Sequence, residues 1–304
     1  MVFAGKQNAP GFVLGAFSVP HKYRMRIFDL SEGVKLGSVE QQAAFMVAVA
    51  EAYDAAPAHD PSATDMWKGL AEHTREVLFR RLKGTNIKIE FVEDDPYEIG
   101  SPEDSVKYLL YDIVKNKRMM VYTGFSDNHP VFDFDDNVKF RAVHDFFAHA
   151  SVRKAFSQSM IASAKKLKLK EWPTLEEAGP LLANVRLPSH MFNVRGELNS
   201  ASEHIRLAPK GAAPALFTEI IGQVCYQVIC GAFPDQKVAI LQDFDHQNIG
   251  KTKRGSRAER RMAEVLEAIQ SGADQIKLDI KAKPTIKTAD LLRGSAAHHG
   301  KLTV

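Results

Sequence analysis

Apolar residues recur at helical spacing along most of the chain, and this pattern predicts a mainly helical protein. Val39–Ala55 is rich in Ala, Glu, Gln and Met, which favour helices. Asp65–Lys83 carries an apolar stripe that ends before Gly84, where a helix is expected to stop. Ser101-Pro102-Glu103-Asp104 has the residues of a helix start, and this helix is expected to run to about Asn116.

Two short segments have the pattern of strands. Ile87–Val92 alternates, with Ile87, Ile89 and Phe91 on one side, and predicts a strand with one face in water. Met119–Thr123 is apolar throughout and predicts a short buried strand. The fold class is therefore mainly α (α+β), a helical domain with a small β-sheet in its N-terminal half. Further helices are expected at about 137–152, 155–168, 175–186, 198–207, 212–232, 235–243 and 256–271.

The distribution of glycine, proline and charged residues divides the chain into three predicted regions. Residues 1–36 contain scattered Gly and Pro and are predicted to be an extended N-terminal arm. Residues 37–250 form the predicted helical domain, and residues 251–304 a basic C-terminal helix and tail. That last region holds 12 Lys and Arg against 6 Asp and Glu, although the whole chain carries only +3. It is either a solvated extension or an arm that contacts nucleic acid or an acidic partner.

Composition excludes several classes of protein. With 304 residues, 45% of them hydrophobic and only two cysteines, the chain has the composition of a globular protein without a disulfide framework. Its longest apolar run is shorter than a membrane span, and Met1-Val-Phe-Ala-Gly-Lys does not resemble a signal peptide. We therefore expect a cytoplasmic protein that does not bind membranes. No P-loop or dinucleotide-binding glycine motif is present.

Candidate chemistry concentrates between residues 129 and 223. His144, Asp145 and His149 lie within six residues of one predicted helix, and His129 lies upstream. Asp145 and His149 share a helix face, whereas His144 and His149 are about 140° apart around the axis. A buried structural network is the alternative to a metal or proton-transfer site, since buried polar side chains need partners.

Other ligands are expected from later helices. Glu219 is flanked by apolar residues and shares a face with Gln223, while Gly196-Glu197 and His204 fall on an earlier helix. An isolated carboxylate in an apolar setting raises its pKa, pairs or binds a cation. Two histidines and one carboxylate suit non-haem iron(II), and adding Glu197 and His204 gives a set able to hold two metals. Asp243-Phe-Asp-His246 is predicted to be a turn.

The segment Val143-His-Asp-Phe-Phe-Ala-His-Ala150 resembles the iron-binding helix of the aromatic amino acid hydroxylases, and Thr218-Glu-Ile-Ile-Gly222 resembles their carboxylate-bearing helix. This resemblance implies an Fe(II) site formed by His144, His149 and Glu219, with Asp145 where the family has an acid near its pterin. The chain departs from the family at Ala148 and Ala150, where the family has Gly and Val.

A second resemblance covers more of the chain. The His-Asp-x-x-x-His helix, the Gly-Glu segment and the Thr-Glu-x-x-Gly-Gln helix are similar to uncharacterised proteins of tailed bacteriophages. We therefore carry two hypotheses forward. The first is a metal-dependent enzyme that uses Fe(II), Mn or Zn for oxygen-dependent hydroxylation or for hydrolysis, with metal ligands His144, His149, Glu219, Glu197 and His204 and with Asp145 as its proton-transfer residue. The second is a non-enzymatic virion or DNA-packaging protein with a basic tail, located in the host cytoplasm or the virion. The substrate and oligomeric state stay open.

Overall fold

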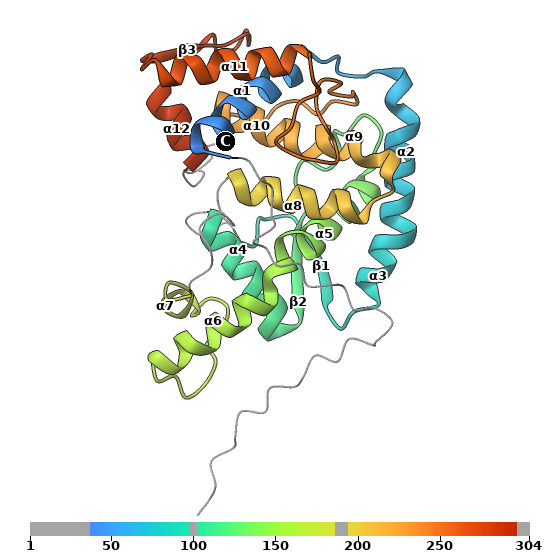
Figure 1. Ribbon diagram of the computed structural model, residues 1–304. Helices are drawn as coiled ribbons and strands as arrows, with labels where there is room; N and C mark the ends of the chain where they lie inside the picture. The colour runs from blue at the N-terminus through green and yellow to red at the C-terminus, as the bar shows by residue number, and fades with distance from the viewer. Residues whose placement is uncertain (1–36, 98–101, 186–193, 297–304) are drawn as a thin grey trace, which may run out of the picture. The chain divides into compact units, whose positions relative to one another are not determined.

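Helix α1 (Val39–Ala55) lies in the hydrophobic core. The structure, a computed structural model, describes residues 37–97, 102–185 and 194–296 (Figure 1), so the predicted arm 1–36 lies outside the described residues. The helix begins with a capping box between Ser38 and Gln41. Residues 42–50 are all buried, so neighbouring elements cover every side of its middle. These neighbours are α10 (Gln223–Cys230), α11 (Arg257–Gln270) and α12 (Thr288–Ala296).

The second predicted helix is confirmed but is not uniform. It consists of α2 (Thr64–His73), the π-helical segment η4 (Thr74–Phe79) and α3 (Arg80–Lys83). A short 3₁₀ turn, η3 (Pro61–Ala63), precedes it. π segments add a residue to the turn and are not visible in an apolar pattern of period 3.6.

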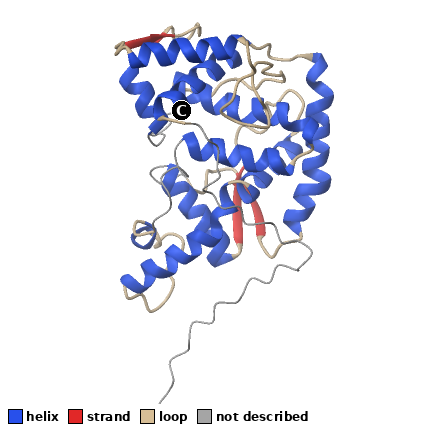
Figure 2. Ribbon diagram, viewed as in Figure 1, coloured by secondary structure: helices blue, strands red, loops and turns tan. Residues whose placement is uncertain are grey.

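The predicted small sheet is a pair of parallel strands, β1 (Lys88–Val92) and β2 (Arg118–Tyr122), joined by α4 (Pro102–Tyr111) and the π segment η5 (Asp112–Asn116). Figure 2 shows how small the strands are beside the helices, and the mainly α fold class is confirmed. The prediction that β1 buries the face that carries Phe91 and exposes only the other face is wrong. Phe91 is 44% exposed because the two-stranded sheet has no third strand to cover its side chain; the Phe79 ring lies against it at a tilt, with centroids 6.3 Å apart.

The middle of the chain differs from prediction at two helices. After α5 (Phe134–Phe147), the 3₁₀ turn η6 (His149–Val152) and α6 (Arg153–Lys166), the expected helix 175–186 is reduced to α7 (Gly179–Leu182). Pro180 cannot continue a helix that arrives from the N-terminal side, because it has no N–H group and its ring clashes with an earlier carbonyl.

The expected helix 235–243 is also wrong, because this segment is irregular. Lys237 donates hydrogen bonds to the carbonyls of Tyr53, Asp54 and Ala56, at the C-terminal end of α1. Val238 forms a parallel bridge with His59. The backbone N–H of Val238 also donates to the carbonyl of Ala58, and the carbonyl of Val238 accepts from the N–H of Asp60, so both backbone groups of Val238 are unavailable to a helix.

A long apolar helix follows α8 (Val194–Leu207) and the 3₁₀ turn η8 (Lys210–Ala212). It is built from α9 (Ala213–Leu216), the π segment η9 (Phe217–Gly222) and α10. By length and composition alone Ala213–Cys230 is able to cross a membrane, but 72% of it is buried inside the protein. Gly222 lies so close to the Tyr53 ring that an added Cβ would stand 2.4 Å from Cδ2. The segment therefore packs as a core helix.

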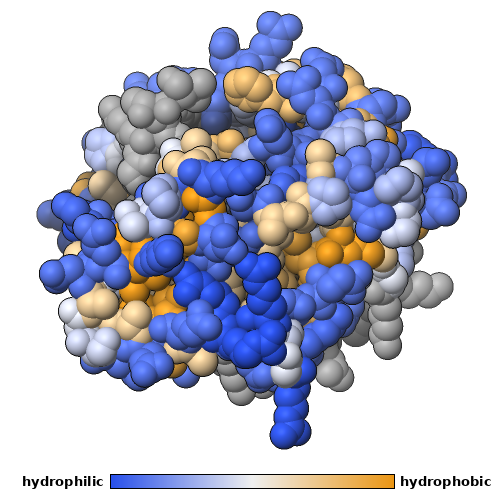
Figure 3. All heavy atoms as spheres, turned by 90° about the horizontal axis from the view of Figure 1, so that it is seen from above, coloured by the Kyte–Doolittle hydropathy of each residue, from blue (hydrophilic) through white to orange (hydrophobic). Residues whose placement is uncertain are grey.

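The basic C-terminal region contributes to the same core. Besides the predicted helix, seen as α11, it forms an antiparallel hairpin of β3 (Gln275–Lys277) and β4 (Thr285–Lys287), which the apolar pattern did not predict. The face of the molecule seen in Figure 3 is mostly hydrophilic, with hydrophobic patches between the hydrophilic side chains. The buried apolar side chains of this region are Ala258, Val265, Ile276, Leu278, Ile280, Ile286 and Leu291.

Candidate functional site

The predicted site begins on α5, which carries His144 and Asp145. The side chain of Asp133 caps the helix by accepting a hydrogen bond from the backbone N–H of Asp136. The apolar face of the helix, including Val143 and Phe146, is buried and fixes its rotation.

His149 is outside this helix, contrary to the expectation of one continuous element. The helix ends at Phe147, and His149 opens the 3₁₀ turn η6. An unbroken helix would place His144 and His149 about 140° apart. Because the backbone changes direction at Ala148, their rings meet edge to face with centroids 4.8 Å apart.

His204 from α8 completes a group of three imidazoles, His144, His149 and His204, which we call the histidine cluster. The Nδ1 atoms of His144 and His204 are 3.4 Å apart, and the Nε2 atom of His144 is 3.4 Å from the Ser200 hydroxyl. The Nε2 atom of His204 is buried and has no hydrogen-bond partner among the described residues. If His144 donates through Nδ1, His204 is left with a buried, unpartnered N–H group. If His204 donates instead, its Nε2 is a buried acceptor without a donor. Either tautomer leaves one unsatisfied polar atom, which costs about 1–3 kcal/mol.

Burial keeps His144 and His204 neutral. It lowers the pKa of His204 to about 3, with a smaller contribution from His73. It also lowers the pKa of His144 well below its usual value, and the neighbouring His149 and His204 lower it further. Neutral imidazole is the form that binds metal ions.

Glu219 lies on the π segment η9 and is engaged by two other residues. Its Oε2 is 3.2 Å from His129 Nε2, and its Oε1 accepts a hydrogen bond of 2.9 Å from Gln223. His129 Nδ1 accepts hydrogen bonds from the backbone N–H groups of Val131 and Phe132, so the ring proton is on Nε2 and points to the carboxylate. His129 therefore holds Glu219 in a fixed orientation.

Arg141 brings a positive charge to the same region. Its Nη1 donates to the carbonyls of Tyr122 and Gly124 at the end of β2. Burial lowers the pKa of Arg141, while the carboxylates of Asp145 and Glu219 raise it, so both carboxylates lie within electrostatic range. The guanidinium of Arg141 therefore lies in the same region as the carboxylates of Asp145 and Glu219.

Aromatic rings connect the Glu219 pair with the histidine cluster. His129 stacks on Phe132 with centroids 4.2 Å apart, Phe132 contacts Phe140, and Phe140 lies 5.0 Å from the His204 ring. These rings exclude water from the space between the two polar groups and strengthen the electrostatic interactions there.

The structure thus brings together only some of the predicted ligands. His144, His149 and His204 are in contact, whereas Glu219 is paired with His129 and Gln223. The side chain of Glu197, on α8, is outside the described part of the chain. Within that part, no three His, Cys, Asp or Glu side chains are arranged to hold one ion. The metal set remains a prediction.

Sequence reasoning gave no role to Arg141 and Ser200, and it left His129 without a partner. Arg141 stands three residues before His144 and four before Asp145, and this spacing, which places the three side chains on one helix face, was a usable signal. The pairing of His129 with Glu219, 90 residues apart, had no sequence signal.

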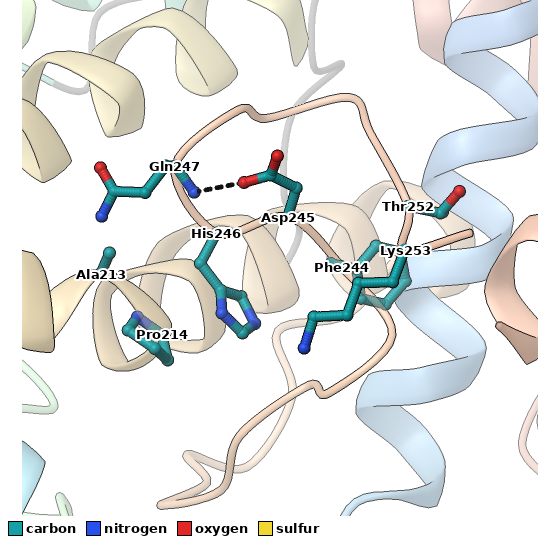
Figure 4. Close-up of a pocket in the computed structure, with 8 residues that line it drawn as sticks. All are labelled: Ala213, Pro214, Phe244, Asp245, His246, Gln247, Thr252 and Lys253. Atoms are coloured by element: carbon teal, nitrogen blue, oxygen red, sulfur yellow. Dashed lines mark hydrogen bonds between the residues drawn. The ribbon is translucent and has the colours of Figure 1, made fainter. Parts of the chain in front are cut away.

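A separate surface cleft of about 440 Å³ lies near the start of α9 and is lined in part by His246 and Lys253 (Figure 4). Asp245 beside it accepts hydrogen bonds from the backbone of Gln247 and Asn248, so the predicted turn is confirmed. His246 Nε2 donates a hydrogen bond of 2.8 Å to the carbonyl of Leu241, so the ring proton is on Nε2. None of the predicted ligands lines this cleft.

Comparisons of the chain with protein-family models, with curated proteins and with solved structures gave no match. The function is therefore inferred from the residues of the site.

Proposed function

We propose that this protein is a metal-dependent enzyme that binds a first-row transition metal, Fe(II), Mn or Zn, at the histidine cluster. The observation that carries the proposal is the neutral pair formed by the partly buried His144 and the fully buried His204, whose Nδ1 atoms are 3.4 Å apart. Two nitrogens bound tetrahedrally at about 2.0–2.1 Å from one ion stand about 3.3–3.4 Å apart. A hydrogen bond between nitrogen atoms is ordinarily shorter than this separation.

The surroundings also fit a cation. His204 offers a second buried nitrogen, Nε2, without a described partner. The carboxylates of Asp145 and Glu219 lie near Arg141 in the same region, and their oxygen atoms would attract a positive ion. His149 is in contact with His144 and is the next donor, and Glu197 and Glu219 remain predicted ligands.

Oxygen-dependent hydroxylation is the reaction we name first, and metal-assisted hydrolysis second. A bound metal of this type supplies Lewis acidity and, as Fe(II), redox chemistry with dioxygen. The protein supplies neutral imidazoles to bind the ion and aromatic side chains to exclude water. Asp145 is the predicted proton-transfer residue, and Glu219 is held by His129 with its Oε2 as a hydrogen-bond acceptor.

Elemental analysis after reconstitution with Fe(II), Mn(II) or Zn(II) tests the proposal. We expect stoichiometric metal in the wild type and its loss in His144→Ala and His204→Gln, with retention in His59→Gln, which changes an exposed histidine. Metal-free wild type, or equal binding in all four proteins, would contradict the proposal. Glu219→Ala tests whether Glu219 is a metal ligand together with His144 and His149. Loss of the metal in this variant as well would support that set of ligands.

The non-enzymatic alternative is favoured by one observation. Lys251, Lys253, Arg254 and Arg260 are all exposed at the start of the C-terminal region, and we call them the C-terminal basic group. A virion or DNA-packaging protein would use this surface for nucleic acid or an acidic partner. This alternative predicts that the protein binds nucleic acid, that the binding weakens steeply as the salt concentration rises, and that it is lost when these four residues are changed to Gln.

A further inference from the structure

A second basic surface lies on α6 and was not singled out by net charge. The exposed residues of α6 include Lys154, Gln158, Ala162, Lys165 and Lys166. Their spacing of three or four residues places them along one side of the helix. None of the exposed α6 residues is acidic, and the middle of this side carries small or uncharged side chains. The side is therefore a flat strip with positive charge at both ends.

The basic strip continues beyond the end of the helix. Lys168 and Lys170 are exposed in the following turn, so four lysines occur within six residues. We call Lys154, Lys165, Lys166, Lys168 and Lys170 the α6 basic face. No ion pair within the described part of the chain involves them. Between residues 153 and 172 the only acid is Glu171. These lysines are therefore not paired with an acid among the described residues and are available to an anionic partner.

Neighbouring elements add to the positive potential. The π segment η5 packs against α6 and brings Lys115 to the same part of the molecule, where its ammonium group lies 5.8 Å from the centre of the Trp172 ring. Burial lowers the pKa of Lys117, and the charge of Lys115 lowers it further. Positive groups therefore crowd here enough to affect one another.

The strip leads from the lysines to the histidine cluster. Helix α6 follows directly on the turn that carries His149, and its 14 residues span about 21 Å. This length corresponds to about six phosphates of one strand of a duplex. At the N-terminal end Arg153 bonds only to the Ala150 carbonyl among the described residues and stacks over Phe146.

We propose that the α6 basic face binds the phosphate backbone of a nucleic acid. Lysines at both ends of a helix side that carries no exposed acid suit a linear polyanion. A protein partner or a membrane needs apolar anchors, and the only large hydrophobic side chain exposed on α6 or its following turn is Leu167, at 37%. The proposal is independent of the metal and differs from the C-terminal alternative in its location.

Fluorescence anisotropy with a labelled 20-nucleotide single strand and a 20-base-pair duplex tests it. The variant changes Lys165, Lys166, Lys168 and Lys170 to Gln, and the matched control changes the four residues of the C-terminal basic group to Gln. We expect the α6 variant to bind at least tenfold more weakly and the control to change less than threefold. The slope of log affinity against log salt should fall by about 0.7–0.9 for each lost phosphate contact.

Three results of the anisotropy measurement would overturn the proposal. These are no salt-dependent binding by the wild type, equal losses in both variants, and a loss in the control alone. Exclusive binding to phosphatidylserine vesicles would also overturn it. Circular dichroism of both variants checks folding, and the single exposed change Lys154→Glu gives a second reading of the same surface. Binding retained in His204→Gln separates this site from the proposed metal site.

Discussion

At the scale of single residues, the most informative side chains are buried groups whose ordinary form is polar or charged. His129 is fixed in one tautomer because two backbone N–H groups occupy its Nδ1. His204 is the opposite case, since one of its nitrogens has no described partner. A satisfied histidine and an unsatisfied histidine therefore lie at the two ends of one row of aromatic rings.

The first prediction concerns pH and the metal-free protein. His204 has a pKa of about 3 when folded and 6.5 as its ordinary value. Between these values the unfolded chain binds more protons, so the free energy of unfolding falls as pH falls from 6.5 toward 3. One such group contributes at most about 1.4 kcal/mol per pH unit. Urea denaturation at a series of pH values measures this slope.

The matched variants are His204→Gln and His59→Gln. His204→Gln should flatten the pH dependence by about one proton, because glutamine cannot titrate there. His59→Gln should leave the slope as it is in the wild type, since His59 is exposed. An unchanged slope in His204→Gln would show that burial of this imidazole does not control the acid sensitivity.

At the scale of elements, α1 and α11 are joined by a buried ion pair. Arg261 donates through Nε and Nη2 to the two carboxylate oxygens of Glu51, each at 2.8 Å. Glu51 also accepts a hydrogen bond from the backbone N–H of Asp279. One carboxylate therefore ties the core helix to the C-terminal helix and to the segment after β3.

The second prediction is that Glu51→Gln destabilises the protein by about 2–3 kcal/mol, measured by chemical denaturation. The change keeps the size of the side chain but removes the charge that pairs with Arg261 and one of its two acceptor oxygens, while Arg261 keeps its pair with Glu264; hydrogen bonds to charged groups contribute about 1.5–3 kcal/mol. Arg257→Gln is the control, because its pair with Asp279 is exposed on both sides and should have little effect. Equal effects of the two changes would contradict this account.

The helices also show which parts of the fold the local sequence predicts and which it does not. The boundaries of α1 follow from helix-favouring residues and a capping box that are written locally in the sequence. The break after Phe147 and the irregular segment 235–243 do not follow from local pattern. In the second case Lys237 is bonded to the end of α1, more than 180 residues away, and no local spacing encodes that contact.

At the scale of the whole molecule, the C-terminal region is part of the fold. Its charge suggested a solvated helix and tail, but its apolar residues lie in the same cluster as those of α1. Charged side chains point outward from elements whose other side is buried. A basic composition and a core role are therefore compatible in one segment.

The third prediction follows from this packing. Deletion of residues 251–304 should abolish cooperative thermal unfolding, because it exposes the side of α1 that α11 and α12 cover. The control changes the C-terminal basic group to Gln in the full chain, which removes a similar type of charge without touching the core. A deletion variant with an unchanged thermal unfolding transition would contradict this prediction and show that the region is a tail that does not stabilise the core.

The candidate site divides in the same way between sequence and structure. Residue types identified His144, Asp145, His149, His204 and Glu219, because histidines and carboxylates on apolar helices are conspicuous in any sequence. Residue types did not show that Glu219 pairs with His129 while His204 lies against His144.

The sequence by itself determined the helical class, most helix positions and the candidate chemistry, since propensity, capping and apolar spacing act within a few residues. Only the tertiary structure decided which imidazoles meet, which carboxylate is already paired and which basic residues share one face. These are matters of distance between segments far apart in the chain. They depend on how buried faces pack, and packing is a property of the whole chain.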